Sequence, residues 1–470
     1  MPKVIPSSRT THDHTRVNDA SRILKRLYVF ERQLMRALAG WFVRTAPVEL
    51  KFFLAGELWL SSQQADSLRT RVLELRYPRR DVDKKWDADV LAFTHELMKA
   101  PDLRRFLAGV YQVALPAFVS ALDSYLERAD PLDDAPTVYR IRHLKLDAQA
   151  RIDAAQSQIE THAPEGDDPA GWIRHIEGML RAMGGLDGLA QRVPPAADQP
   201  FAGLPDFTLP AAVTRDPRFK PARFHLPHEN KFDKAGAAAW KRIEALDKRA
   251  AMQVWSAISH FNEIWAAEVP ASVLFDLDNQ PWEFYLDLAR WAWDEARHSY
   301  MGYRTLQRWG WDVPALIPYG DALYNALAHL PPAQRLALLY YYEEGLLRSG
   351  TKQIEIQILE SAGDAGSTQD MDYDWADEAI HVSFGFKWLR HLLGDDRAGQ
   401  DELKRLTDEA RAVMAAYVEA HKDDPEAQLA PYFERLYPII SAMAYEIADD
   451  GLDIRWAPVV ADEAVLEDLS

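Results

Sequence analysis

The sequence predicts an all-α protein. Two observations support this class. Apolar residues recur at the helical spacing of 3.6 residues in both halves of the chain, and helix-breaking prolines concentrate in one segment between the halves. With 470 residues, the chain is long enough for two or three domains and a substantial core. We therefore expect two helical regions joined by an extended connector.

The first helical region is predicted over residues 17–190, after a polar, flexible segment at residues 1–16. Within it, Leu24, Leu27 and Leu34 share one apolar stripe of a helix. Turn signals containing proline interrupt the pattern, so we expect several helices in this region.

Residues 191–235 form the predicted connector. Eight prolines between residues 192 and 230 are too many for a regular helix or a central strand. Four aromatic side chains in the same segment predict that it packs across a surface of the protein: Phe201, Phe207, Phe219 and Phe224.

The second helical region is predicted over residues 236–395, followed by C-terminal helices and an acidic tail in residues 396–470. Pro281 suits the first turn of a helix, where its missing N–H is harmless. Pro270 should kink or end the helix that carries Glu263.

An Asp-Glu-Ala-x-His motif occurs twice in this second region, at residues 294–298 and 377–381. Each copy puts a carboxylate and an imidazole at i, i+3 on one helical face, where both can reach the same ion. A single Glu-x-x-His pair occurs by chance on many solvated helices. Two copies that also share the flanking Asp and Ala indicate a dinuclear metal site in a four-helix bundle.

Such a site needs one further glutamate from each of the other two helices. Glu263 precedes Glu295 by 32 residues, and Glu344 precedes Glu378 by 34 residues, the distance expected for a helix, a turn and part of an antiparallel return. The predicted ligands are therefore Glu263, Glu295, His298, Glu344, Glu378 and His381.

In each of the other two helices, more than one glutamate could be the metal ligand. Glu268 is the alternative to Glu263, which the spacing favours by a modest margin. Glu343 is the alternative to Glu344, because adjacent helical residues point about 100° apart and only one can face the site. Glu355 is a third candidate if the helix is broken shortly before it.

Two aspartates and one arginine flank the predicted ligands. Asp294 and Asp377 could each accept a hydrogen bond from the distal imidazole nitrogen of the opposite motif; the alternative is an aspartate at a helix start or on the surface. Arg297 is expected either to neutralise a buried carboxylate or to be solvated.

The ligand types indicate the metal. Carboxylates with two imidazoles suit iron or manganese better than soft ions, and bridging carboxylates bring two ions within about 3.5–4 Å of each other. The sequence has no cysteine, so it offers neither thiolate ligands nor disulfides. We expect two iron ions, with a Mn/Fe pair as the alternative because it uses the same ligands.

At these residues the chain resembles the ferritin-like di-iron carboxylate superfamily, over residues 240–395. The stretches 259–263 and 361–364 are similar to a bacterial ferritin-like family of unknown function. The resemblance implies a ferritin-like four-helix bundle and an O₂-dependent oxygenase or oxidase acting on a small organic substrate. The alternative is a metal-binding ferroxidase or scaffold without an organic substrate. Iron storage is not expected, because the chain is much larger than a storage protein needs.

The first helical region contains a partial match to the same pattern. Aligning residues 59–66 with residues 291–298 places Gln63 at the motif glutamate and Asp66 at the motif histidine, with Glu31 32 residues before Gln63. Region 17–190 is then either a degenerate, ligand-poor bundle with a structural or dimer-forming role, or an unrelated helical domain.

Composition restricts the partners. A formal net charge of −18 argues against a phosphate-binding surface, so no nucleic-acid partner is expected. We find no apolar stretch that approaches the roughly 18 residues of a transmembrane helix, and no signal peptide. Without a glycine-rich nucleotide loop, electrons would come from a separate reductase. The expectation is a cytoplasmic enzyme that uses O₂ and a small molecule, with a homodimer as one form of assembly.

Overall fold

The computed structural model describes residues 15–163, 166, 168–194, 207–210, 212–222, 233–320, 322–425 and 428–443. Within these ranges the all-α prediction is confirmed, because almost all regular structure is helical. The two strands found there are two residues long each, and β1 (Pro221–Ala222) pairs in parallel with β2 (Tyr319–Gly320).

The chain divides into two compact units. The first comprises residues 1–38 and 57–208, and the second comprises residues 39–56 and 209–470. The division after residue 208 falls within the predicted connector. Residues 39–56, which we expected in the first helical region, belong instead to the second unit. Residues 1–14 of the predicted flexible start (residues 1–16), much of the proline-rich connector and the acidic tail lie outside the described residues.

Helices α1 (Val17–Arg44) and α2 (Val48–Glu74) each contribute residues to both units. The other helices of the first unit are α3 (Arg79–Val82), α4 (Ala88–Met98), α5 (Leu103–Ala108), the π-helix η1 (Gly109–Ala114), α6 (Leu115–Arg128), α7 (Ala135–His162) and α8 (Ala170–Ala182).

The continuous stretch Leu103–Arg128 is long and apolar enough to cross a membrane by length and composition, so the expectation that no apolar stretch approaches this length was wrong. Two-thirds of its most apolar window (67%) is buried inside the structure. Burial against α7 and α8 accounts for the apolar composition, because a helix buried in a protein core has the same signature.

The interior of the first unit contains a buried arginine. The Arg151 guanidinium donates to Glu57 at 2.8 Å, to Gln64 at 3.0 Å and to Ser61 at 2.8 Å, and Glu31 lies 3.4 Å away. Gln63, aligned above with the motif glutamate, is exposed; Gln64 reaches the interior instead. An arginine cation therefore neutralises the buried carboxylates of this unit. A groove of about 500 Å³ between α2 and α7 contains no residue of the metal-ligand clusters described below.

The second unit is built from α9 (Lys234–Glu244), α10 (Lys248–Asn262), α11 (Ile264–Asp276), α12 (Trp282–Arg308), α13 (Val313–Leu316), α14 (Ala322–Leu327), α15 (Pro332–Ser349), α16 (Thr351–Ser361), α17 (Ala365–Leu393), α18 (Arg397–His421) and α19 (Ala430–Met443). Helices α18 and α19 are the C-terminal helices expected after residue 395.

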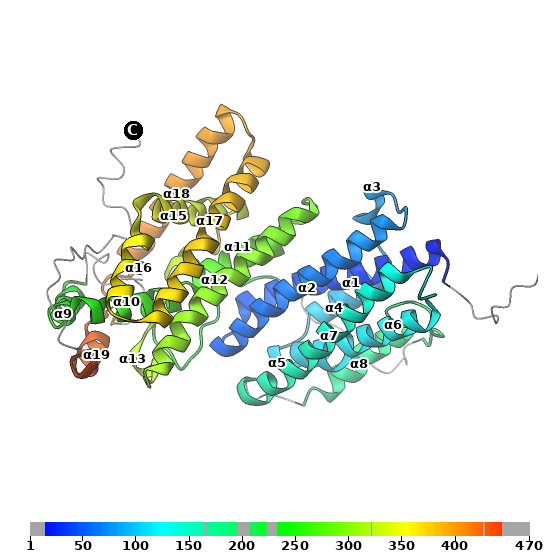
Figure 1. Cartoon of the computed structure of the whole chain (residues 1–470), viewed down its shortest axis with the longest axis horizontal. Helices are drawn as coiled ribbons and strands as arrows, with labels where there is room; N and C mark the ends of the chain where they lie inside the picture. Colours follow the sequence, from blue (N-terminus) through cyan, green and yellow to red (C-terminus); the bar gives the residue numbers. More distant parts are fainter. Residues whose placement is uncertain are drawn as a thin grey trace, which may run out of the picture. The chain divides into compact units, whose positions relative to one another are not determined.

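Four helical segments of this unit pack in a closed ring: the pair of consecutive helices α10 and α11, counted as one segment, and helices α12, α15 and α17. Helix α12 packs against α10, α11 and α17, and α15 packs against α11 and α17. Figure 1 shows α12 running alongside α11 and α17. Gly302 permits the closest approach in the ring, because a Cβ atom there would lie 2.3 Å from the carbonyl oxygen of Ala257 on α10. The ring brings α12 and α17, the helices that carry the two motifs, into contact.

The helix break predicted at Pro270 occurs earlier in the chain. Helix α10 ends at Asn262 and α11 begins at Ile264, so Glu263 lies at the junction and Pro270 lies inside α11. The Asn262 side chain stabilises this junction by donating to Ile258 O at 3.1 Å and accepting from Gly320 N, next to the short strand pair. The expectation that the proline ends the helix was therefore wrong.

A buried ion pair joins residues 39–56 to the rest of the second unit. Lys51 Nζ lies 2.8 Å from Glu268 Oε1, with both side chains fully buried, and Arg215 donates to the same carboxylate at 3.0 Å. Burial lowers the pKa of Lys51 to about 8, although the negative charge of Glu268 opposes this shift. Glu268 therefore neutralises two cations and is not free to bind a metal ion.

We predict that Glu268→Gln destabilises the second unit by about 3–5 kcal/mol, because it leaves two buried cations without their carboxylate. Thermal unfolding followed by circular dichroism measures the effect. Asp408→Asn, which removes one half of an exposed ion pair with Lys404, is the control and should leave the unfolding midpoint unchanged. An unchanged midpoint in Glu268→Gln would show that the ion pair is not needed for folding.

Candidate metal centre

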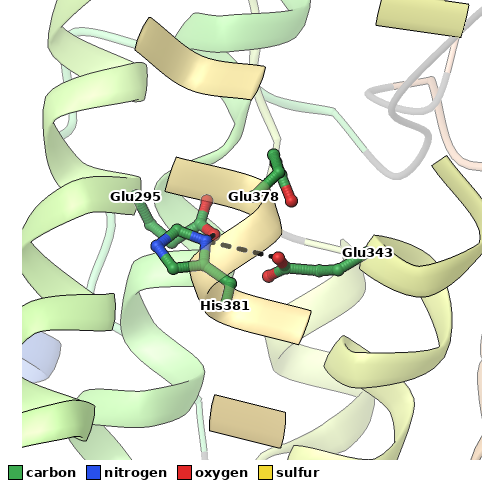
Figure 2. Close-up of side chains that lie close together, drawn as sticks. All are labelled: Glu295, Glu343, Glu378 and His381. Atoms are coloured by element: carbon green, nitrogen blue, oxygen red, sulfur yellow. Dashed lines mark ion pairs between the residues drawn. The ribbon is translucent and has the colours of Figure 1, made fainter. Parts of the chain in front are cut away.

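Two overlapping groups of acidic and imidazole side chains lie inside the ring of helices. The first metal position comprises Glu295 from α12, Glu343 from α15, and Glu378 and His381 from α17, whose ligand atoms lie within 4.8 Å of one another. Figure 2 shows the three carboxylates converging on the imidazole. His381 Nδ1 lies 3.0 Å from Glu295 Oε1 and 3.3 Å from Glu343 Oε2, so these atoms face one common point.

The second metal position surrounds the other motif histidine. His298 Nδ1 lies 3.4 Å from Glu263 Oε2 and 3.3 Å from Asp374 Oδ1. Glu295 and Glu378 also belong to this position, because each forms a group with His298 whose ligand atoms lie within 4.8 Å. Among the described residues, all the groups that could hold a metal ion lie in this one cluster of the second unit.

Glu295 is placed between the two positions. Its Oε1 lies 3.0 Å from His381 Nδ1, whereas its Oε2 lies 3.7 Å from His298 Nδ1. Each oxygen of the one carboxylate therefore faces a different imidazole. This is the arrangement expected of a carboxylate that bridges two ions.

The residues fit a metal centre because the cluster is buried and many of its polar atoms have no hydrogen-bond partner. Buried polar atoms are normally hydrogen-bonded, so a group of unpaired acceptors facing one point indicates a site for a cation. The buried atoms of this cluster without a partner include Glu263 Oε2, His298 Nδ1, Glu343 Oε2, Asp374 Oδ1, Glu378 Oε2 and His381 Nδ1.

Burial and mutual repulsion change the pKa values in opposite directions within the cluster. Burial and the charge of Glu295 raise the pKa of Glu343, and burial with the charge of Glu343 raises that of Glu378 well above its usual value. Burial also favours the protonated form of Glu295, but His298 and His381 outweigh it and lower the pKa. Without cations, the carboxylates cannot all be ionised, so the cluster retains protons.

Each motif orients the histidine of the other motif. His298 Nε2 hydrogen-bonds Asp377 Oδ2 at 3.3 Å, and His381 Nε2 lies 3.5 Å from Asp294 Oδ2. The predicted hydrogen bond from the opposite motif is therefore confirmed for Asp377, whereas His381 Nε2 approaches Asp294 without a hydrogen bond. Both aspartates are buried, so the surface alternative is wrong. With each distal nitrogen facing an aspartate of the other motif, the Nδ1 atoms are left to face the metal positions.

Two arginines neutralise these aspartates. Arg297 pairs with Asp377 and lies 3.2 Å from Asp294, while Arg290 also pairs with both. Burial raises the pKa of Asp377, but its bonds with His298 and Arg297 bring the value down to about 2. The first of the two roles expected for Arg297, partner of a buried carboxylate, is therefore confirmed.

Trp291 positions the carboxylates of the first metal position. Its Nε1 donates to Glu343 Oε1 at 2.9 Å and to Glu295 Oε1 at 3.2 Å, and its ring stacks on His381 with centroids 5.4 Å apart. The single indole N–H thus holds one oxygen of each carboxylate. Glu343 Oε2 is left facing His381.

The structure brings five of the six predicted ligands together and replaces the sixth. Glu343 lies in the cluster with 4% of its side chain exposed, whereas the Glu344 side chain is 29% exposed and pairs with Arg348 at 2.7 Å. The prediction of Glu344 was wrong because the 34-residue spacing cannot distinguish adjacent positions that point about 100° apart on a helix.

The remaining alternatives lie outside the cluster. Glu268 is paired with Lys51, as described above. The helix does break before Glu355, at Gly350 with φ of 71°, yet Glu355 belongs to none of the metal-ligand groups and is only partly buried. Burial raises the pKa of Glu355 to about 7.

Sequence reasoning missed His260 and Asp374. Both lie in the second metal position, and His260 Nε2 hydrogen-bonds Asp374 Oδ2 at 3.3 Å. Their spacing carried a usable signal: His260 precedes Glu263 by three residues and Asp374 precedes Glu378 by four, so each lies one turn from a ligand on the same face.

Comparison with known proteins gives one match. A family model described as a protein of unknown function (DUF455) matches residues 207–430, a stretch that contains all the residues of both metal positions. No curated protein and no solved structure matches the chain. This part of the chain is therefore similar to a family whose function has not been assigned, and the chemistry must be argued from the site.

We predict that Glu343→Gln lowers the metal content of the purified protein, because it removes the only ligand that α15 supplies to the first position. Elemental analysis measures the number of ions per chain. Glu344→Gln changes the adjacent residue in the same way and should leave the metal content unchanged. Equal losses in both variants would contradict the assignment of Glu343.

We also predict that metal uptake near neutral pH releases protons. The raised pKa values of Glu343, Glu378, His298 and His381 mean that the metal-free cluster holds protons that a cation must displace, so affinity should increase as pH rises. Titration calorimetry in two buffers of different ionisation enthalpy measures the release. Identical heats in both buffers would show that no proton is displaced.

Proposed function

We propose that the second unit is a ferritin-like di-iron protein that uses O₂ to oxidise a small organic substrate, as an oxygenase or oxidase. The observation that carries this proposal is the placement of Glu295, whose two carboxylate oxygens face His381 and His298 separately. A single-ion site would not need a carboxylate shared in this way.

The donor set supports iron as the resident metal. Carboxylate oxygens with imidazole nitrogens, and no thiolate, suit iron or manganese, and a Mn/Fe pair would use the same ligands. Two ions held there would supply the capacity to bind and reduce O₂ next to a substrate.

The chain's own residues would hold and insulate this centre. Glu295, Glu378 and His381 are 3% exposed or less, so the ring of helices excludes bulk water from the ligands. The Asp294 and Asp377 carboxylates fix the orientation of the imidazoles and increase their basicity. Reducing electrons would come from a separate reductase, since the sequence contains no glycine-rich nucleotide loop.

The experiment begins with metal analysis of protein expressed in iron-supplemented medium. The protein is then loaded anaerobically with Fe(II), exposed to a pulse of O₂ and followed by optical absorption. We expect two iron ions per chain and an O₂-dependent absorption change that decays faster when the correct substrate is present. Oxidation of iron alone, with no small molecule consumed, would favour the ferroxidase alternative. A chain that binds no iron would refute both.

We predict that Glu295→Ala and His381→Ala each abolish stoichiometric iron binding and the O₂-dependent signal while leaving the helical circular dichroism largely intact. Glu295 serves both positions, and His381 supplies the imidazole of the first. Glu344→Ala is the matched control and should behave like the unmodified protein. Retention of two ions in either ligand variant would refute the ligand assignment.

A further inference from the structure

The second metal position differs from the first in charge and in ligand number. In addition to the shared Glu295 and Glu378, the first position has Glu343 and His381. The second has His298 and three further groups. Glu263 and Asp374 lie close to His298 Nδ1, and His260 lies close to Glu263 and Asp374. It therefore contains at least one more carboxylate than the first.

Asp374 presents one free oxygen to this second position. Its Oδ2 accepts from Lys352 Nζ and from His260 Nε2, whereas its Oδ1 has no hydrogen-bond partner and lies 3.3 Å from His298 Nδ1. The side chain is fully buried, so water cannot satisfy Oδ1. One oxygen is thus held by the protein, and the other is left to face a cation.

Lys352 places a positive charge next to the same position. Its side chain is 6% exposed, its ammonium pairs with Asp374, and it lies 4.0 Å from Glu378 Oε1. In the described part of the chain, Glu343, the carboxylate that belongs to the first position alone, forms no ion pair with a lysine or arginine; it interacts instead with Trp291 and His381. A second divalent ion would therefore bind closer to this ammonium than the first, because Lys352 pairs with Asp374 of the second position and approaches the first position only through the shared Glu378.

On the basis of the proposed dinuclear centre, we infer that its two positions are unequal: Asp374 is an additional terminal ligand of the second position, and the Lys352 ammonium lowers the affinity there. The two ions then bind in order. The first fills the position of Glu343 and His381, and the second fills the position of Glu263, His298 and Asp374. The site would accordingly pass through a state that holds one ion.

Titration of the full-length, metal-free protein with Mn²⁺ tests this order, with bound Mn²⁺ followed by electron paramagnetic resonance. The unmodified chain should bind two ions in two resolved steps, and the signal of an isolated ion should give way to that of a coupled pair. Asp374→Asn should lose the weaker step and keep the tighter one. Glu343→Gln should lose the tighter step.

Asp370→Asn is the matched control for Asp374→Asn. Asp370 is buried on α17 one turn earlier, pairs with Arg304 and belongs to no metal-ligand group, so this variant should bind two ions in two steps. Two unchanged steps in a folded Asp374→Asn protein would overturn the inference and leave the dinuclear centre intact. Failure of the unmodified chain to bind Mn²⁺ would instead refute the proposed centre itself.

Lys352→Met provides a second test that retains every ligand. Removing a charge that repels the second ion should tighten the weaker step by about tenfold or more, while the tighter step changes less, because Coulomb energy falls with distance. Circular dichroism checks that the variant is folded. A weaker step that is unchanged, or weaker still, would contradict the role assigned to Lys352.

Discussion

The second unit depends on keeping several carboxylates buried at close range. Four carboxylates are each 3% exposed or less: Glu295, Glu343, Glu378 and Asp374. Their burial costs solvation free energy, and their negative charges repel one another. Positive charges must therefore lie close to these carboxylates. The structure supplies part of this charge through Lys352 and through Arg290 and Arg297 on the flanking aspartates. Bound cations would supply the remainder.

In the first unit, an arginine side chain neutralises the buried carboxylates. The buried Glu31 and Glu57 surround the Arg151 guanidinium, which is held by charge and by hydrogen bonds. A guanidinium is permanently charged and is covalently fixed, so this unit needs no exchangeable cation. The Glu-x-x-His motifs accordingly occur in the sequence of the second unit and not in that of the first.

The sequence was sufficient for the helical class and for the two motifs, because periodicity and i, i+3 spacing are local properties of a helix. It was insufficient where the answer depended on rotation about a helix axis. Glu343 and Glu344 differ by about 100° in direction, and only the packing of α15 against α11 and α17 selects one of them. Similarly, Pro270 is a local signal for a break, but the junction formed at Glu263, where Asn262 bonds to Gly320 from a distant segment.

The exchange of partners between the two motifs has a consequence for biosynthesis. The Asp377 carboxylate orients His298, and the Asp294 carboxylate faces His381, so neither α12 nor α17 can present an oriented imidazole by itself. An ion that meets the nascent chain after α12 has emerged finds an incomplete set of donors. Metal acquisition would then have to wait until translation has passed residue 381 and the two helices have docked, so loading would be a late step of folding.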